Sequence, residues 1–256
     1  IEDSVVKPNW LNHIDLADNV SLAWQAKMAE IIADEESTLP NQHLIAQNLC
    51  SHWYKIEKPL QNISVYNFHY ALPDAALLNK DFPFPICFDE TGFCAPSHFS
   101  YRKQAWRFML AGGASFNNLD YSFHINSENG SDTTRNLKFG WGGPEFRRQL
   151  KVLRDFLYSL QFINMYPDKS FILSGIPESD DIQAFISSGE CYIVYFGTGN
   201  QFNLELDIAV GRYQVHWIDP ATGKIIKSSE ISFDNTNQQL KTPKFEQDLV
   251  LKIVNK

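Results

Sequence analysis

The stretch Pro85-Ile-Cys-Phe-Asp-Glu-Thr-Gly-Phe93 decides the fold class of the first part of the chain. Three apolar residues run directly into two acids, Asp89 and Glu90, and a Thr-Gly turn follows. This order is typical of a buried parallel strand that carries a carboxylate to its C-terminal end. In a β/α barrel, active sites are built at that end of the strands. The alternative is an ordinary strand-end acid that caps the next helix.

Helix and strand patterns alternate on both sides of this stretch. Apolar spacing predicts helices at 22–37, 101–111 and 144–160, and a short helix or turn at 73–81. The first helix is expected to have Ser21 as its N-cap, after a polar and irregular start. The predicted strands are 43–48, 63–70, 86–90 and 114–121. This alternation indicates a parallel sheet, and four strands are half of an eight-stranded barrel.

The pattern changes after about residue 166. Short alternating runs replace helices, at 171–173, 182–186, 191–196, 202–208, 213–218, 225–231 and 249–254. Seven short strands separated by turn signals indicate a β-sandwich. The expected fold is therefore α/β plus all-β: the C-terminal half of a (β/α)8 TIM barrel (1–166), followed by a small antiparallel β-sandwich (167–256).

Composition narrows the function classes. The chain has 256 residues, 44% of them hydrophobic, and a formal net charge of −8. The acidic charge and the lack of a basic stripe argue against nucleic acid, and no apolar run approaches the roughly 18 residues of a membrane span. An aromatic content of 14% suits a neutral ligand such as a sugar, although aromatics more often belong to a core.

We expect no metal and no cofactor. His13, His43, His52, His98 and His124 lack metal-ligand spacing, and no phosphate-binding glycine loop or GxSxG turn is present. The cysteines Cys50, Cys87, Cys94 and Cys191 show no CxxC spacing, so free thiols are expected.

Glu90 is the leading candidate for catalysis, ahead of Asp89. Neighbours on a strand face opposite sides, so only one of the two acids is expected to face into a barrel. The last residue before the turn is best placed at the mouth of the barrel, where it could be a nucleophile in glycoside chemistry. The alternative places both acids in a surface loop.

Other polar residues end successive predicted strands and would converge on the same site. The candidates for substrate binding are Asn48, His69, Tyr70, Asp120, Tyr121 and Trp141. His69 and Tyr70 could hydrogen-bond a neighbouring carboxylate, and Trp141 could stack on a sugar face. The alternatives are a half-buried sheet histidine, a turn-forming Asn48 and a tryptophan packed on its own domain.

Several motifs together resemble a known family. They are 43–48 (HLIAQN), 67–70 (NFHY), 88–93 (FDETGF), 101–113 (YRKQAWRFMLAGG) and 117–123 (NNLDYSF). They resemble the second half of the barrel in bacterial clan-A glycoside hydrolases, most closely the apiosidase-like, DUF4038-type group. Residues 191–196 and 211–223 resemble the small sandwich that follows those barrels, which carries the label "putative collagen-binding domain of a collagenase".

The resemblance implies a retaining hydrolase, bacterial and secreted or periplasmic, that acts on a carbohydrate. Glu90 matches the nucleophile on strand seven, and His69 and Tyr70 match positions that line the pocket on strand six. The acid/base of the family lies in an Asn-Glu-Pro type motif on strand four, which this sequence lacks. The chain begins with Ile1 and is expected to start just past that residue, as a piece of a longer protein.

A half barrel would expose two sheet edges, so we expect a missing N-terminal half-barrel segment or self-association. The alternative function is a non-catalytic carbohydrate- or matrix-binding fragment, with the β-sandwich as its active part. A third reading is a purely structural sandwich that stabilises the barrel.

Overall fold

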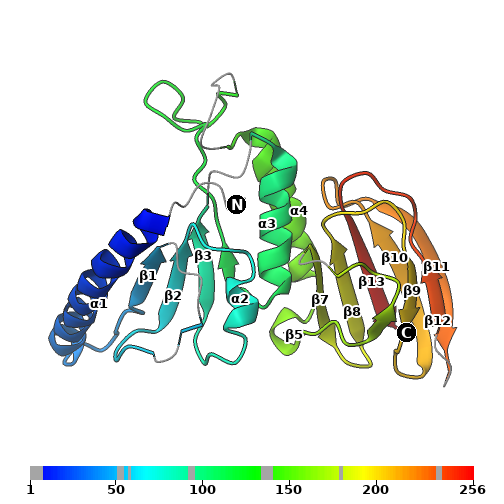
Figure 1. Cartoon of the computed structure of the whole chain (residues 1–256), viewed down its shortest axis with the longest axis horizontal. Helices are drawn as coiled ribbons and strands as arrows, with labels where there is room; N and C mark the ends of the chain where they lie inside the picture. Colours follow the sequence, from blue (N-terminus) through cyan, green and yellow to red (C-terminus); the bar gives the residue numbers. More distant parts are fainter. Residues whose placement is uncertain are drawn as a thin grey trace.

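The computed structural model describes residues 8–50, 55–56, 59–91, 96–133, 141–178, 181–234 and 238–256. Its first region contains α1 (Pro8–Glu36), β1 (Ala46–Cys50), β2 (Val65–His69), α2 (Ala75–Leu78), β3 (Ile86–Glu90), α3 (His98–Leu110), β4 (Ser115–Phe116) and α4 (Pro144–Tyr158). The second region begins with η1 (Phe162–Asn164) and continues with strands β5 to β13. In Figure 1, α3 and α4 lie between the parallel sheet of the first region and the antiparallel sheets of the second.

The first region is built on a parallel sheet with the strand order β1-β2-β3-β4. Alternate residues of these strands point to one face, where Leu49, Tyr66, Phe68, Ile86 and Phe88 are buried. They belong to one apolar cluster with residues of α2 and α3. This burial explains the apolar half of each strand pattern, since side chains on a strand alternate with a period of two.

The two central helices have clear end signals. Pro144 and Glu145 open α4, where the fixed φ of proline and a negative charge both suit a helix N-terminus. Gly112 follows α3 with a φ of +95°, a conformation that favours glycine.

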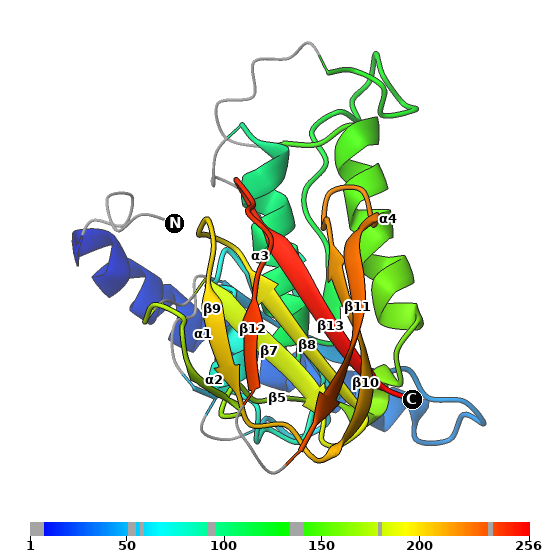
Figure 2. The same ribbon diagram turned by 90° about the vertical axis from the view of Figure 1, so that its right-hand side faces the viewer.

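The second region consists of β5 (Tyr166–Pro167), β6 (Ile172–Ser174), β7 (Ile182–Ser187), β8 (Cys191–Phe196), β9 (Asn203–Leu206), β10 (Gly211–Ile218), β11 (Ile225–Phe233), β12 (Gln238–Lys241) and β13 (Leu249–Asn255). Six strands form one antiparallel sheet in the order β11-β10-β13-β8-β7-β5, and β12-β9-β6 form another. Both sheets contribute to a second apolar cluster, which includes Val194, Leu204 and Trp217. Figure 2 shows these sheets in front of α3 and α4.

Polar and aromatic contacts join α3 to the six-stranded sheet. Arg102 pairs with Asp248 at 2.7 Å, and both side chains are buried. Trp106 stacks on Tyr195 with ring centroids 5.7 Å apart. Arg107 lies 3.1 Å from Asp181, just before β7. The two regions therefore share a packed and charged interface.

Three of the sequence expectations need correction. The start of the chain is not irregular up to Ser21, because α1 already begins at Pro8. The predicted strand 114–121 is only two residues long, because the chain turns after β4 and Asp120 forms an isolated bridge with Trp141. The first strand lies at 46–50 rather than at 43–48, because residues 46–50 are the ones that pair with β2.

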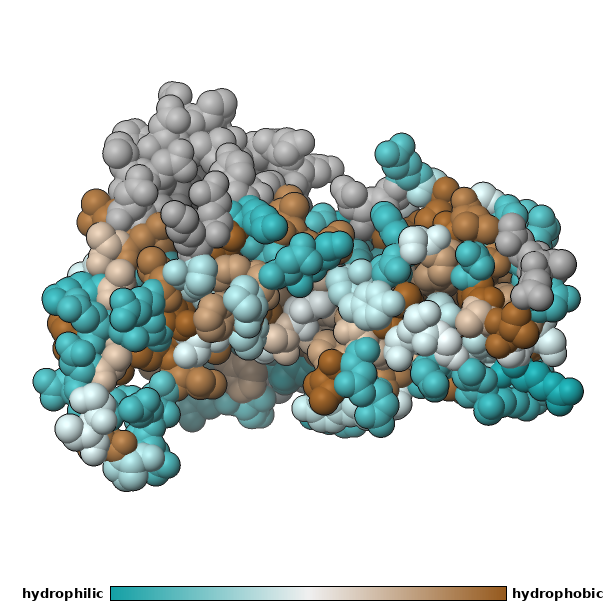
Figure 3. Space-filling model, turned by 90° about the horizontal axis from the view of Figure 1, so that it is seen from below, coloured by the Kyte–Doolittle hydropathy of each residue, from teal (hydrophilic) through white to brown (hydrophobic). Residues whose placement is uncertain are grey.

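The mixed α/β architecture, with a parallel sheet followed by antiparallel sheets, is confirmed. Cys87 and Cys191 are free thiols, as expected; Cys94 and the side chain of Cys50 lie outside the described structure. No described helix combines the length and apolar character that crossing a bilayer requires. On the face seen in Figure 3, hydrophobic residues are interspersed with hydrophilic ones.

Candidate active site

The parallel strands carry most of the candidate residues to their C-terminal ends. Asn48 lies near the end of β1, His69 ends β2 with Tyr70 directly after it, and Glu90 ends β3. Asp120 and Tyr121 follow β4 in a turn, and Trp141 lies shortly before α4. The geometry divides these residues into two groups with separate contacts.

The end of β3 departs from a regular strand. Cys87 pairs with Asn67, and Phe88 with Phe68, but the register then shifts so that His69 pairs with Glu90. On a regular strand, Asp89 would share the face of Cys87, two residues before it. The extra residue instead makes Glu90 the register partner of His69. The expected alternation of the two acids therefore fails at this point, and both lie near the same imidazole.

The His69 ring lies between the two carboxylates. Its Nε2 atom is 3.1 Å from Oδ1 of Asp89, and its Nδ1 atom is 3.7 Å from Oε2 of Glu90. The Tyr70 hydroxyl donates a short hydrogen bond to Oε1 of Glu90. The side chain of Glu90 is 30% exposed, so it is shielded yet accessible. One oxygen of Glu90 is thus held by Tyr70, and the other faces His69.

The backbone of Tyr70 is in an unusual conformation. Its φ is +52°, a region that residues other than glycine rarely adopt. The backbone N–H of Tyr70 donates to the carbonyl of Glu90 at 2.9 Å, so both the main chain and the side chain of Tyr70 bond to Glu90. Backbone strain of this kind costs about 1–3 kcal/mol and is concentrated at functional sites.

Asn48 lies on the edge strand and is exposed. Its Oδ1 atom accepts a hydrogen bond from Nδ2 of Asn67 at 3.3 Å. Its backbone N–H and C=O bond to the side-chain amide of Gln25 on α1, at 2.9 and 3.1 Å. Gln25 thereby satisfies polar groups that an edge strand would otherwise leave open.

The carboxylate of Asp120 is occupied by neighbouring groups. Ser122 donates to it through its backbone and its hydroxyl, Gly143 through its backbone, and Arg147 forms an ion pair with it. Burial opposes ionisation, but these hydrogen bonds outweigh it and lower the pKa of Asp120 below its ordinary value. Asp120 therefore ties the turn after β4 to α4, and its role in substrate binding stays a prediction.

Trp141 is hydrogen-bonded to His98, a pairing that the sequence patterns do not predict. Its Nε1–H donates to Nδ1 of His98 at 2.7 Å, and His98 also stacks on Phe146. This bond needs a neutral His98, and burial lowers the pKa of His98 below its ordinary value, which favours that form. Tyr121 joins the group through its backbone N–H, 3.4 Å from the carbonyl of Trp141.

The contacts therefore connect His69, Tyr70, Asp89 and Glu90 in one group, and Asp120, Tyr121 and Trp141 in another. Sequence reasoning missed Asn67, His98 and Arg147. Asn67 could have been found, because it lies two residues before His69 and so on the same strand face. The pairings of His98 and Arg147 join residues 43 and 27 positions apart, and no local pattern predicts them.

No cluster of three or more metal-ligating side chains occurs in the part of the chain that the structure describes. The group around Glu90 consists of one imidazole, one phenol and two carboxylates, those of Asp89 and Glu90. Such a set can orient a carboxylate, transfer protons and stabilise positive charge on a substrate.

Comparisons with known proteins place this geometry in context. Residues 166–254 match the family model described as "Putative collagen-binding domain of a collagenase". No curated protein matches the sequence. A solved structure titled "Glycoside hydrolase" is 16% identical, with a TM-score of 0.62, over 88% of this chain and 60% of its own. A glycoside hydrolase family 5 structure from Bacteroides vulgatus ATCC 8482 is 15% identical, with a TM-score of 0.64, over 92% of this chain and 65% of its own.

The chain thus spans less than two thirds of the length of these two solved structures. At such low identity, the likeness concerns the fold alone. Over the part that it covers, the chain shares the fold of solved glycoside hydrolases, and its last 91 residues include a segment similar to the collagen-binding family model.

Proposed function

We propose that this chain is the C-terminal part of a retaining glycoside hydrolase with Glu90 as its nucleophile. The observation that carries the proposal is the Tyr70–Glu90 hydrogen bond at the carboxyl end of the parallel sheet, beside His69. A nucleophilic carboxylate must be held in one orientation toward the sugar carbon that it attacks. Tyr70 fixes one oxygen of Glu90 and stabilises its charge, which leaves the second oxygen for attack.

The fold supports this placement of the site. In β/α barrels the active site lies at the carboxyl ends of the strands, where Glu90 is found. We propose that the parallel sheet is the second half of a (β/α)8 barrel and that β5–β13 form a β-sandwich behind it. On this proposal the chain is of the apiosidase-like, DUF4038-type kind, from a bacterial, secreted protein, and it acts on a carbohydrate.

The second catalytic carboxylic acid is proposed to lie outside this chain. Retaining hydrolysis needs two carboxyl groups about 5–5.5 Å apart. Asp120 is committed to Arg147 and Ser122, and Asp89 lies on the far side of the His69 ring from Glu90. We place the acid/base on an N-terminal barrel half, which is consistent with the 60–65% coverage of the related structures.

The open side of the parallel sheet supports such a partner. Asn48, Asn67 and Cys87 are register partners on adjacent strands, and none of them is fully buried. In a closed barrel, inward residues are packed in layers. Trp24 on α1 is 64% exposed beside the β1 edge. We propose that the missing half barrel, or a second copy of this chain, covers this side. Light scattering that gives a folded monomer of 29.4 kDa without any second fragment would count against it.

The catalytic proposal is tested with Glu90→Gln in the longer protein that contains the missing half. Turnover of an aryl glycoside should fall by roughly a thousandfold or more, because the nucleophile is lost while the shape is kept. Glu230→Gln, on the exposed strand β11, is the matched control and should leave turnover unchanged. Near-normal turnover by the Glu90 variant would exclude Glu90 as the nucleophile.

The second candidate is a non-catalytic carbohydrate- or matrix-binding fragment. It is favoured by the match of residues 166–254 to the collagen-binding family model. On this alternative, the whole chain binds a polysaccharide or collagen in a pull-down assay, Glu90→Gln does not change the binding, and no form of the protein hydrolyses glycosides. If the chain retains neither ligand, this candidate fails.

A further inference from the structure

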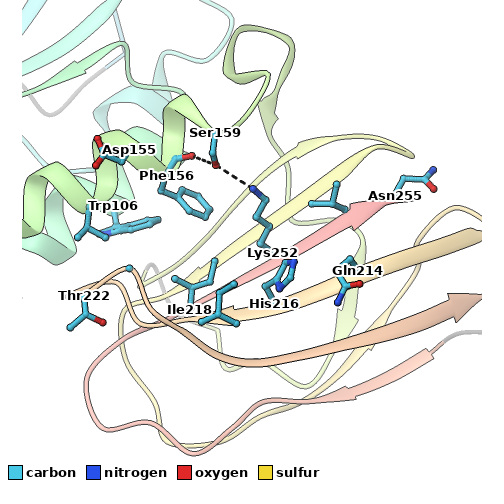
Figure 4. A pocket seen from close by; sticks show the side chains of 14 residues that line it. Trp106, Asp155, Phe156, Ser159, Gln214, His216, Ile218, Thr222, Lys252 and Asn255 are labelled. Atoms are coloured by element: carbon cyan, nitrogen blue, oxygen red, sulfur yellow. Dashed lines mark hydrogen bonds between the residues drawn. The ribbon is translucent and has the colours of Figure 1, made fainter.

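We infer that a groove between α4 and the six-stranded sheet binds a small ligand that carries a carboxylate, and that Lys252 contacts this group. The groove has a volume of about 620 Å³, within the range typical of small-molecule sites. It is lined by Asp155, Phe156 and Ser159 at the end of α4 and by Gln214, His216 and Lys252 on the sheet, among others (Figure 4).

The groove exists because the helices cover only part of the sheet. Phe185, Ile193 and Val250 are buried in one cluster with residues of α3 and α4. Gln214 and His216 on β10, nearer the sheet edge, are only partly buried. The covered face of the sheet thus ends in a depression with an apolar wall and a polar floor.

Within the part of the chain that the structure describes, Lys252 is a cation without an anionic partner in this groove. Its ammonium lies 3.3 Å from the hydroxyl oxygen of Ser159 and 5.5 Å from the centre of the Phe156 ring. The Ser159 hydroxyl donates its own proton to the carbonyl of Phe156 at 2.6 Å and accepts from Lys252 through its oxygen, so it is a neutral partner that supplies no negative charge. Among the described residues, no carboxylate lies within ion-pair distance of Lys252. Burial lowers the pKa of Lys252, as expected for a cation that lacks a counter-charge.

Trp106, in the wall of the groove, carries a hydrogen-bond donor, its buried indole N–H, that has no acceptor among the residues the structure describes. The nearby carboxylate of Asp155 is neutralised by Lys151 and Arg154 on its own helix. The indole nitrogen itself is not exposed in the groove, so the preference for a ligand with acceptor oxygens rests on the ammonium of Lys252.

The charge count selects a carboxylate rather than a dianion. Lys252 supplies one positive charge, and His216 is kept neutral because burial and then Lys252 lower its pKa. One cation matches one carboxylate better than a phosphate, which carries close to two charges at neutral pH. The Phe156 ring suits an apolar ring face, and the carbonyl oxygen of Gln214, whose amide nitrogen donates to Ser228 and Ser229, suits a hydroxyl, so we take a sugar acid as the probe.

None of these lining residues belongs to the candidate active site, so this inference does not depend on the proposed function. The test uses the whole chain with lysine labelled at its ε-carbon, titrated with glucuronate and, separately, with glucose. We expect glucuronate to shift the Lys252 resonance and to bind at least about tenfold more tightly than glucose, because only glucuronate pairs with the ammonium. Inorganic phosphate is included to test the charge preference and should bind more weakly than glucuronate.

Lys252→Met keeps most of the stem of the side chain and removes the charge, so it should reduce glucuronate binding at least about tenfold. Lys244→Met, at an exposed position of the same region, is the matched control and should bind like the wild type. The wild-type titration is independent of how well either variant folds. If glucose binds as tightly as glucuronate, if the Lys252 resonance does not respond, or if phosphate binds more tightly than glucuronate, the inference is wrong.

Discussion

The buried ion pair between α3 and the antiparallel sheet makes a strong prediction for stability. Arg102 bonds to both oxygens of Asp248, at 2.8 and 2.7 Å, and also to Oε1 of Gln149 at 2.6 Å. The Tyr195 hydroxyl donates to the same carboxylate at 3.1 Å. Burial works against the charged form of Arg102, but Asp248 outweighs it and raises the pKa of the guanidinium. The network joins α3 and α4 of the first region to the six-stranded sheet of the second.

Asp248→Asn keeps the volume of the side chain and removes its charge. The guanidinium of Arg102, in a side chain only 4% exposed, then stays buried without a counter-charge. Removing one partner of a buried pair costs about 3–5 kcal/mol of unfolding free energy. In a chain of this size each kcal/mol lowers Tm by roughly 2–4 °C, so a fall of about 6–20 °C is expected.

The assay is urea unfolding followed by far-UV circular dichroism, with thermal unfolding as a second measurement. Glu230→Gln breaks the exposed pair with Lys256 and is the matched control, with an expected loss below about 1 kcal/mol. Replacing both partners, as Arg102→Met with Asp248→Leu, should recover much of the loss, because no charge is then buried. A loss below about 1 kcal/mol for Asp248→Asn, or a double variant less stable than the single one, would refute the reasoning.

Three further predictions follow from single sites. Tyr70→Phe should lower glycoside turnover by the longer protein about tenfold or more with little change in KM, because it removes the donor that orients Glu90; unchanged kcat would contradict this role. Gly175→Ala should cost about 2–4 kcal/mol in urea unfolding, since φ is +92° and a Cβ atom would lie 1.8 Å from a backbone oxygen, whereas Gly189→Ala, with open space around it, should cost about 1 kcal/mol. Burial lowers the pKa of His98 in the folded chain, so as pH falls below about 6.5 the unfolded chain binds a proton at this imidazole before the folded chain does. The unfolding free energy should therefore decrease on acidification. It should decrease less in His98→Gln.

Local sequence patterns were sufficient for the elements that position the candidate nucleophile. The strand predicted at 86–90 has those bounds in the structure. Its apolar residues Ile86 and Phe88 alternate with a period of two and are buried, and the strand ends at its two acids. The start of α4 at Pro144 was equally readable, since proline at the first turn acts within a few residues.

The tertiary structure decided how the side chains of the site meet. The register shift beside β2 sets Glu90, rather than Asp89, opposite His69, and it depends on pairing between strands 20 residues apart. The carboxylate of Asp120 is taken by Arg147, and that of Asp248 by Arg102, across 27 and 146 residues. The sequence alone determined which residues can form strands and helices, because those preferences are local. Only the folded chain determined which charges form ion pairs and which, like Lys252, have no carboxylate within ion-pair distance among the described residues, because pairing depends on three-dimensional proximity.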